Sequence, residues 1–353
     1  MSAARGTIPN QRAPKAWALR NVLTLSLLFF AVLPAAIVGW TMHKSNLQTV
    51  DALAYKVISG VAERVQLGSQ EHLNKAQTIF NGLLPENPTS QQAARALELL
   101  QNPLQFETLA FALTRMTPDV TLLYYGNAKG EFLGVTPAAE DSQTRSKVGV
   151  QTSLAQGRLY YSADKPGDRS QSLPGEGKAY DARTGIWYKT ALEARARIFT
   201  QAYPSLSIKQ LVITMAQPVH SVDGATAGVF AIDLYLQRLS DLLQVQKISA
   251  NGIAFIVDQD GYLVASSAGD ALFSERGDAL VRLKPDQSLN PVVQQAYKLA
   301  LPVLQKTQES AALRQSFESR FGGGTQSLVG VMRPFGESEG LSWSLVVAAP
   351  GSV

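Results

Sequence analysis

The sequence predicts an α+β fold in which an N-terminal transmembrane helix continues as a long exit helix that carries two tandem antiparallel-sheet modules. Three observations support this prediction. Residues 21–43 contain no Asp, Glu, Lys or Arg. Apolar residues then recur at helical spacing across residues 44–84. The remainder of the chain contains the same pair of predicted β-hairpins twice.

The uncharged segment 21–43 has the length and the flanking residues of a transmembrane helix. At a rise of about 1.5 Å per residue it crosses a hydrocarbon core of roughly 30 Å. Trp17 and Trp40 lie near its two ends, where interfacial aromatic residues are common. Residues 1–20 hold four basic residues and no acid, namely Arg5, Arg12, Lys15 and Arg20. This basic tail is therefore expected in the cytoplasm, with a single span in the cell inner membrane and the rest of the chain in the periplasm.

A cleaved signal peptide is the alternative interpretation of the same segment. Signal peptides usually have a shorter apolar core, which is followed by a cleavage site of small residues. Here the apolar run is long and leads directly into a helical pattern. These features favour an uncleaved anchor.

The charge and composition argue against several classes of protein. The chain has 32 basic and 28 acidic residues, and the four basic residues of the N-terminal tail account for the whole difference. The remainder has no basic tract that could follow a phosphate backbone, so no nucleic-acid partner is expected. The absence of Cys excludes disulfides and thiolate metal sites. The three histidines, His43, His72 and His220, are scattered, and no metal site is expected.

No motif for catalysis is present. The sequence lacks a Gly-x-Ser-x-Gly elbow, a His-Glu-x-x-His zinc motif and a complete phosphate-binding loop. Neither an enzyme nor a cofactor is therefore expected, and a membrane-anchored hydrolase is disfavoured. The run that begins at Asp258 starts like a calcium-binding loop, but Gly269 stands where that loop requires a Glu. A hairpin turn is the preferred interpretation of this run.

Residues 44–118 form the predicted helical part of the exported region. An amphipathic helix across 44–84 ends at Pro85 and Pro88, and a shorter helical region covers roughly 90–115. The long helix can pack along its own domain, and it can also contact the same helix of a second copy. The two interpretations are compatible, and we expect a homodimer that forms through this helix.

A short hairpin and a long hairpin occur twice in the same order. The short hairpins cover residues 121–135 and 252–267, and the long hairpins cover 209–235 and 325–350. A helical and loop segment separates the two hairpins of each pair. This repetition indicates an internal duplication of one α+β module, an antiparallel sheet with helices on one face.

The duplication divides the sheet-containing region into residues 119–246 and residues 247–353. A helical segment at 236–246 joins the two modules. The chain as a whole is 45% hydrophobic, which is enough to bury a substantial core.

The first module contains a set of aromatic and acidic residues that carries a family resemblance. Tyr180 precedes the pair Trp187 and Tyr188, which opens a helical pattern; Tyr203 lies on the next predicted strand, and Asp233 ends the second long strand. Together with the signal anchor, the exit helix and the tandem modules, this set resembles the double Cache (dCACHE) sensor domains of bacterial transmembrane receptors. The resemblance covers about residues 45–350.

The resemblance implies two PAS-like modules, of which the first is membrane-distal and binds a ligand. The residues it implies for ligand binding are Tyr180, Arg183, Trp187, Tyr188, Tyr203 and Asp233. Two positions depart from the family pattern. Gly185 stands where amino-acid-sensing relatives carry an Arg that anchors a carboxylate, and Ser205 stands where many relatives carry an acid. Arg183, two residues before Gly185, is the expected substitute if it reaches in from the turn.

The chemistry of this set fits a small organic ligand. Aromatic rings can surround such a ligand, and a ligand ammonium could pair with Asp233, whose burial in an apolar strand is otherwise costly. Without the arginine at 185, an amine or a neutral heterocycle is favoured over an amino acid. The alternative is that Trp187 caps the core and Asp233 caps the helix that follows it.

The function that the resemblance implies is extracytoplasmic sensing of a small molecule by a membrane-anchored domain. The signal would pass across the membrane to an output module that is not present in this chain. The alternative is a membrane-anchored scaffold or assembly protein with no small ligand.

Overall fold

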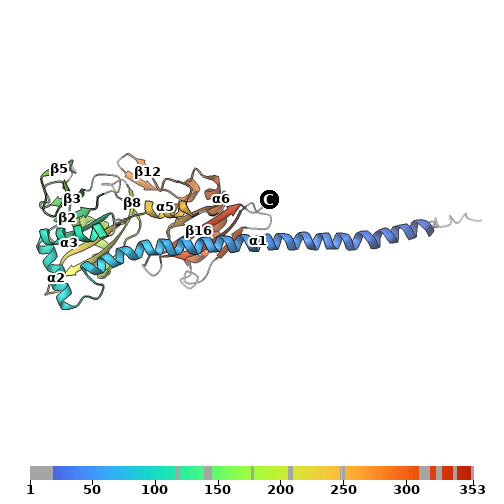
Figure 1. Cartoon of the computed structure of the whole chain (residues 1–353), viewed down its shortest axis with the longest axis horizontal. Coiled ribbons are helices and arrows are strands. Elements are labelled where there is room, and N and C mark those ends of the chain that lie inside the picture. Colours follow the sequence, from blue (N-terminus) through green and yellow to red (C-terminus); the bar gives the residue numbers. More distant parts are fainter. Residues whose placement is uncertain are drawn as a thin grey trace, which may run out of the picture. The chain divides into compact units, whose positions relative to one another are not determined.

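The computed structural model describes residues 19–116, 120–138, 145–175, 179–205, 210–246, 248, 251–277, 279–309, 319–322, 328–336 and 340–350. The predicted basic tail lies almost wholly outside these residues. The chain divides into two units, Met1–Ala52 and Leu53–Val353, and helix α1 (Leu19–Leu83) runs through the boundary between them (Figure 1).

The first unit contains the apolar part of α1. The window Leu23–Trp40 has a mean hydropathy of 2.1, and its side chains are exposed. Within the described residues, this is the one helix that is long and apolar enough to cross a membrane. Pro34 lies inside it without ending the helix. The window lies within the predicted span 21–43.

In the second unit, α1 is amphipathic as predicted. Its buried face includes Ile58, Val61, Val65, Leu73, Ala76, Phe80 and Leu83. The single helical region expected at 90–115 is instead two helices, α2 (Ser90–Gln101) and α3 (Pro103–Met116). Pro103 explains the break, because proline lacks an N–H and disfavours helical geometry at the residue before it. Thr89 and Gln92 form a capping box that starts α2.

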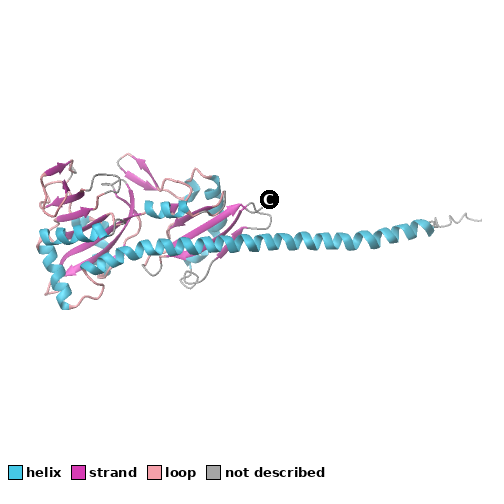
Figure 2. Cartoon of the chain, viewed as in Figure 1, coloured by secondary structure: helices cyan, strands magenta, loops and turns pink. Residues whose placement is uncertain are grey.

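The described residues of the first module form a nine-stranded antiparallel sheet in the order β5-β4-β3-β2-β1-β9-β8-β6, with β7 also paired to β8 (Figure 2). The two predicted hairpins are β1–β2 and β8–β9. Strands β3, β4 and β5 were not predicted; they extend the sheet beyond β2. The strand bounds are β1 Leu122–Asn127, β2 Phe132–Thr136, β3 Ser146–Gln151, β4 Leu159–Ala163, β5 Gln171–Leu173, β6 Ile198–Phe199, β7 Tyr203–Ser205, β8 Gln210–His220 and β9 Thr226–Tyr235.

The second module repeats the core of this topology. Its described sheet has the order β11-β10-β16-β15-β14, in which the first four strands correspond to β2-β1-β9-β8. This equivalence confirms the repeated hairpins, whereas the module boundary near residue 246 stays a prediction. The elements are α5 Gln237–Val245, β10 Ile253–Val257, β11 Leu263–Ser266, β12 Phe273–Arg276, β13 Ala279–Arg282, α6 Pro291–Glu309, β14 Ser319–Gly322, β15 Leu328–Phe335 and β16 Trp343–Pro350.

The run that begins at Asp258 is a hairpin turn, as preferred from the sequence. Its carboxylate Oδ1 accepts hydrogen bonds from the backbone N–H of Asp260 at 3.0 Å and of Tyr262 at 2.9 Å, and Oδ2 pairs with Arg282. Gly261 adopts a φ of +77°, which glycine tolerates best. The carboxylate thus bonds to the turn that joins β10 to β11 and to Arg282 at the end of β13.

The first sheet buries side chains on both of its faces. Successive residues of a strand point to opposite faces, so Leu123 and Tyr125 of β1 join the main core with α1, α2 and α3. Tyr124, between them, joins a second apolar cluster, to which helix α4 (Ile186–Ala194) contributes Trp187. The candidate site lies on this second face.

Candidate functional site

The second face of the first sheet presents a polar group at the junction of β1, β8 and β9. The backbone register pairs Asp233 of β9 with Leu122 of β1 and with Thr214 of β8. Around it the face is built from small residues such as Ala216 and Ala231. This register brings the predicted acid of β9 and a threonine of β8 side by side on one surface.

Glycine allows α4 to pack closely against this face. A Cβ added to Gly126 would lie 2.6 Å from the Cβ of Ala182 and 2.8 Å from Cη2 of Trp187. Carbon atoms essentially never approach so closely. The indole of Trp187 therefore rests directly on the backbone of β1, next to Tyr124.

Asp233 is buried, with 5% of its surface exposed. Its Oδ1 accepts a hydrogen bond from the Tyr124 hydroxyl at 2.8 Å and another from Thr214 Oγ1 at 2.6 Å. Because Thr214 donates its single hydroxyl proton to Asp233, the Tyr203 hydroxyl, 2.7 Å from Thr214 Oγ1, is the donor in that contact. Both hydrogen bonds to the carboxylate end on Oδ1, and neither uses Oδ2.

Burial raises the pKa of Asp233 to about 6, although the hydrogen bonds from Thr214 and Tyr124 and the positive charge of Arg158 act in the opposite direction. Burial and the negative charge of Asp233 raise the pKa of Tyr124 and of Tyr203 well above the ordinary phenol value. At neutral pH the site therefore holds a carboxylate surrounded by neutral hydroxyl donors.

A group of aromatic rings extends from Tyr124, whose hydroxyl bonds to this acid. The ring of Tyr124 meets Trp187 edge-on at 4.9 Å between centroids and lies 5.4 Å from Phe132. Trp187 contacts Tyr188 at 5.4 Å, and Phe132 contacts Tyr180 at 6.5 Å. The structure thus brings four of the five predicted aromatic and acidic residues, Tyr180, Trp187, Tyr188 and Asp233, into one group, and Tyr203 joins it through Thr214.

The packing around Gly185 leaves no room for the arginine that amino-acid-sensing relatives are expected to carry at this position. Gly185 is the N-cap of α4, and a Cβ at this position would lie 2.5 Å from Trp187 Nε1 and 2.9 Å from the Tyr180 hydroxyl. Those two groups occupy the space that a larger residue would need. An arginine at position 185 is incompatible with this packing.

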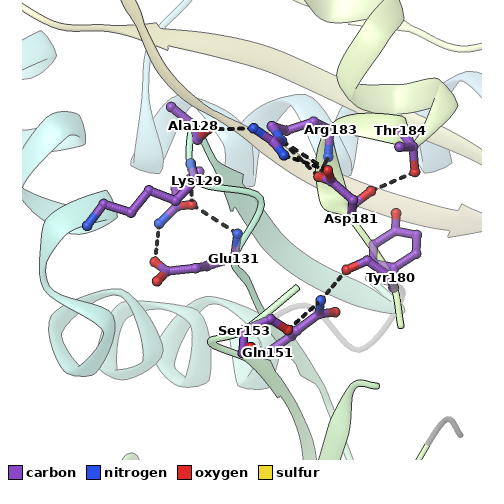
Figure 3. A network of polar contacts seen from close by, with 10 residues as sticks. Ala128, Lys129, Glu131, Gln151, Ser153, Tyr180, Asp181, Arg183 and Thr184 are labelled. Atoms are coloured by element: carbon purple, nitrogen blue, oxygen red, sulfur yellow. Dashed lines mark hydrogen bonds and ion pairs between the residues drawn. The ribbon is translucent and has the colours of Figure 1, made fainter. Parts of the chain in front are cut away.

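The guanidinium of Arg183 is paired with Asp181 in this structure (Figure 3). Its Nε is 2.9 Å from Asp181 Oδ1 and its Nη2 is 2.7 Å from Asp181 Oδ2, while Nη1 approaches the carbonyl of Ala128 at 3.4 Å. The hydrogen bond from Arg183 holds the pKa of Asp181 below its usual value. The guanidinium is therefore directed to its neighbour Asp181, and a contact between Arg183 and a ligand stays a prediction.

The structure also decides between the two interpretations of Asp233. Helix α5 begins after Leu236, whose side chain forms no cap, and Asp233 is bonded to Tyr124 and Thr214 instead. Asp233 therefore does not cap the following helix. Trp187 is 4% exposed, so it packs in the core as the alternative interpretation expects. It also contacts Tyr124, which bonds to Asp233.

Sequence reasoning missed Arg158. This residue directly precedes β4 and is 7% exposed. Its guanidinium carbon lies 3.8 Å from the ring centroid of Phe132 and 4.3 Å from that of Tyr180. The only signal in the sequence is a basic residue ahead of two tyrosines, at 160 and 161. This signal does not identify a site residue from the sequence alone, because the position of Arg158 depends on β3 and β4 extending the sheet beyond β2.

Comparison with known families adds to this geometry. The dCache_1 family, described as a Cache domain, matches residues 42–352. The chain belongs to the Cache domain family. This match covers both sheet modules and the exit helix, and it confirms the double Cache resemblance.

Methyl-accepting chemotaxis proteins are among the relatives of this chain. The methyl-accepting chemotaxis protein PscA of Pseudomonas syringae pv. tomato is 34% identical over 85 residues, which are 24% of this Cache chain and 13% of that protein. The methyl-accepting chemotaxis protein TlpA of Bacillus subtilis is 31% identical over 133 residues, or 36% and 19% of the two chains. The alignments thus span less than a quarter of the length of these relatives.

Solved structures of similar fold are ligand-binding domains of chemoreceptors. The domain of Campylobacter jejuni Tlp3 in complex with 4-methylisoleucine is 16% identical, with a TM-score of 0.49, and the match covers 85% of this chain and 92% of that one. The domain of Pseudomonas aeruginosa PctB in complex with L-Arg is 17% identical, with a TM-score of 0.47 and coverage of 86% and 96%. The ligands in those two structures are amino acids.

Proposed function

We propose that this Cache chain is the extracytoplasmic sensor of a transmembrane receptor and that its first module binds a small organic ligand. In this proposal α1 anchors the chain in the cell inner membrane, both modules lie in the periplasm, and the signal passes to an output module on the other side. The match to the Cache domain family and the chemotaxis proteins among the relatives support this assignment.

The observation that carries the proposal is the buried carboxylate of Asp233. An ionised carboxylate is expensive to bury unless it is paired. Two hydroxyl groups donate hydrogen bonds to Oδ1. A ligand cation can pair with the other oxygen of the carboxylate, Oδ2. A ligand ammonium at this position would also be attracted to neighbouring ring faces, a contribution of roughly 0.5–2 kcal/mol.

The residues proposed for ligand contact follow from this arrangement. Asp233 binds the ammonium, Tyr180, Trp187, Tyr188 and Tyr203 supply ring surface and hydroxyl groups, and Arg183 lies at the rim. Trp187 and Tyr188 are buried, so a ligand that contacts their rings has to displace part of α4. Such a shift is a conformational change that a sensor can use.

Helix α1 supplies the proposed route for the signal. It is continuous from the apolar window to Leu83, and Leu53, Val57 and Leu67 are large apolar side chains that it leaves exposed, at 59%, 59% and 66%. An exposed apolar row of this kind supports the proposed homodimer, since it would be covered by the same helix of a second copy.

Titration calorimetry of the full chain in detergent micelles tests the sensor proposal. The panel should contain amines, amino acids and purines, and Asp233→Asn serves as the matched variant. We expect one chemical class to bind the wild type and to lose most of its affinity in the variant. A chain that binds no member of the panel, and whose melting temperature none of them raises, would instead fit the scaffold alternative.

A further inference from the structure

The turn that leads into α4 is attached to the turn between β1 and β2 (Figure 3). The N–H of Ala182 donates to the carbonyl of Gly130 at 3.5 Å, and Nη1 of Arg183 approaches the carbonyl of Ala128 at 3.4 Å. Gly130 has a φ of +84°, and a Cβ at this position would lie 2.7 Å from Oδ1 of Asp181 and 3.2 Å from Nε of Arg183. The Arg183–Asp181 pair therefore rests directly on the β1–β2 turn.

The β1–β2 turn is held in place by its own hydrogen bonds. Oδ1 of Asn127 accepts from the backbone N–H of Lys129 and of Glu131, both at 3.0 Å, and the N–H of Gly130 donates to the carbonyl of Asn127 at 2.9 Å. The strands on either side of the turn belong to the nine-stranded sheet. This turn is thus a fixed surface against which the segment before α4 closes.

The segment before α4 and the start of the helix are bonded into one piece. The hydroxyl of Thr184 donates to the carbonyl of Asp181 at 2.7 Å, and the N–H of Gly185 donates to the carbonyl of Ala182 at 3.2 Å. Ala182 is fully buried and belongs to the same apolar cluster as Trp187. A movement of Asp181 away from the β1–β2 turn would therefore carry the first turn of α4 with it.

Fixed attachments lie on both sides of this piece. Before it, Gln151 of β3 donates a hydrogen bond to the carbonyl of Tyr180. After it, Arg197 donates to the carbonyl of Leu84 at the end of α1 and to Oε1 of Gln217 in β8. Residues 181–195 can consequently move while the chain on either side stays bonded to the sheet and to α1.

The two ends of α4 are attached with different strength. Arg197, beyond the C-terminal end, is partly buried and bonds to two other elements. At the N-terminal end the charged contact is the Arg183–Asp181 pair, whose side chains are 43% and 27% exposed. Exposed ion pairs contribute little because water screens them. The N-terminal end of α4 should therefore release before the C-terminal end.

We infer that the Arg183–Asp181 pair is a latch on the entrance to the candidate site. While the pair rests on the β1–β2 turn, α4 is closed and Trp187 and Tyr188 stay buried. When the pair leaves the turn, the N-terminal end of α4 moves outward about the end that Arg197 holds. This inference rests on the proposed sensor function and deepens it by naming the way into the site. Arg183 acts here as a positioning residue.

Modification of a single thiol measures this opening, because the chain contains no Cys. A cysteine is introduced either at Ala191 of α4 or at Ala300 of α6, two fully buried alanines on helices of the first and the second module. The full chain in detergent micelles reacts with methyl methanethiosulfonate, at a concentration at which reclosing outpaces modification. The rate then follows the population of the open form.

Arg183→Met removes the charged contact and keeps an unbranched side chain. It should raise the modification rate at position 191 about two- to tenfold, as expected for the loss of an exposed ion pair and a weak carbonyl contact. The rate at position 300 should not change. Arg183→Lys keeps the charge without the planar fork and should give a smaller increase. It is the second variant if Arg183→Met does not fold, as judged by thermal unfolding.

Lys129→Met is the matched control. Lys129 lies on the β1–β2 turn, and its ammonium extends away from Arg183 (Figure 3), so the variant removes an exposed cation from the same place without touching the pair. It should leave the modification rate unchanged at both positions.

Two outcomes would overturn the latch: no increase at position 191 in Arg183→Met, or an increase of the same size at positions 191 and 300. The second outcome would mean a general loss of stability. Because the measurement needs no ligand, either outcome leaves the sensor function standing. A calorimetry panel in which no compound binds would instead overturn the sensor function and leave the measured opening of α4 unaffected.

Discussion

The hydroxyl of Tyr124 donates a hydrogen bond to Oδ1 of Asp233 at 2.8 Å, while the ring of the same tyrosine packs edge-on against Trp187. Tyr124 therefore joins the buried acid to helix α4. A ligand that moves Trp187 also moves the group that stabilises the carboxylate. The charge and the helix position are thus coupled through one side chain.

The raised pKa of Asp233 predicts that stability depends on pH in a particular direction. The folded state holds the proton more tightly than the unfolded chain, where an Asp has its ordinary pKa of 3.8, because burial raises the pKa in the folded state to about 6. The stabilisation from this group is fully present below pH 3.8 and is lost as the pH rises through 6, a total on the order of 3 kcal/mol. The free energy of unfolding of Asp233→Asn minus that of the wild type should therefore increase between pH 5 and pH 8.

Asparagine is the appropriate replacement because its Oδ1 still accepts hydrogen bonds from Tyr124 and Thr214. Comparing the two proteins at each pH cancels the titration of every other group. Denaturant unfolding at pH 5 and pH 8 measures the difference. If the two proteins differ in free energy of unfolding by the same amount at both pH values, the pKa of Asp233 is not raised by folding.

Ligand affinity should depend on the same proton. An ammonium pairs with the ionised carboxylate, and protonation below a pKa of about 6 removes that partner. The dissociation constant of the wild type should rise about tenfold for each pH unit below 6 and be constant above it. Calorimetry at pH 5 and pH 7.5 measures the change. Affinity that is unaltered between these values would place the ligand away from Asp233.

Gly185 should be intolerant of any side chain. An added Cβ would lie within 3 Å of Trp187 Nε1 and of the Tyr180 hydroxyl. We expect Gly185→Ala to lower the free energy of unfolding by about 1–3 kcal/mol, as overpacking generally does. Gly185→Arg should destabilise further and should not create a carboxylate site.

The control for this prediction is Gly68→Ala on α1. An added Cβ at Gly68 has no atom within 4 Å, and alanine favours a helix over glycine by about 1 kcal/mol. This variant should be neutral or stabilising. Chemical unfolding of both variants separates local crowding from the general effect of replacing glycine, and a stable Gly185→Ala protein would show that the Trp187 packing is not tight.

Much of the fold could be predicted because its signals are local. The exit helix follows from helical periodicity, and the hairpins follow from turn residues between apolar runs. Strands β3, β4 and β5 were missed because they lack that signal; Leu159 of β4 is exposed, and β5 has no buried residue. Arg158 was missed with them, since its contacts to Phe132 and Tyr180 depend on where those strands place it.

The candidate site, too, could be predicted only where its signals are local in the sequence. Asp233 could be singled out as an acid in an apolar strand, but its partners Tyr124 and Thr214 come from two other strands and depend on register. Arg183 was named as a residue that could reach in from the turn; in the structure it contacts Asp181, an acid that was visible in the sequence. A nearby opposite charge is the simpler partner for a residue in an exposed turn.

Arg197 should couple the site to the exit helix. It follows α4 by three residues, and its guanidinium donates to Asn81 Oδ1 at 2.7 Å and to the carbonyl of Leu84 at the end of α1. Its Nε also donates to Gln217 of β8 at 2.8 Å. Arg197→Met should leave ligand affinity unchanged, because it removes no contact to the Asp233 site. It should weaken the attachment of the segment after α4 to the end of α1, because it removes the hydrogen bonds to Asn81 and Leu84.

The rate of backbone hydrogen exchange at residues 79–84 measures how firmly this end of α1 is attached. In the wild type, ligand should change the exchange rate of this last turn of α1, and in Arg197→Met the ligand effect should be lost while basal exchange increases. Arg195→Met, which alters an exposed residue at the end of α4, is the matched control and should behave as the wild type. If ligand changes exchange equally in all three proteins, α1 receives the signal by another path, since the Arg197 bonds would then carry none of it.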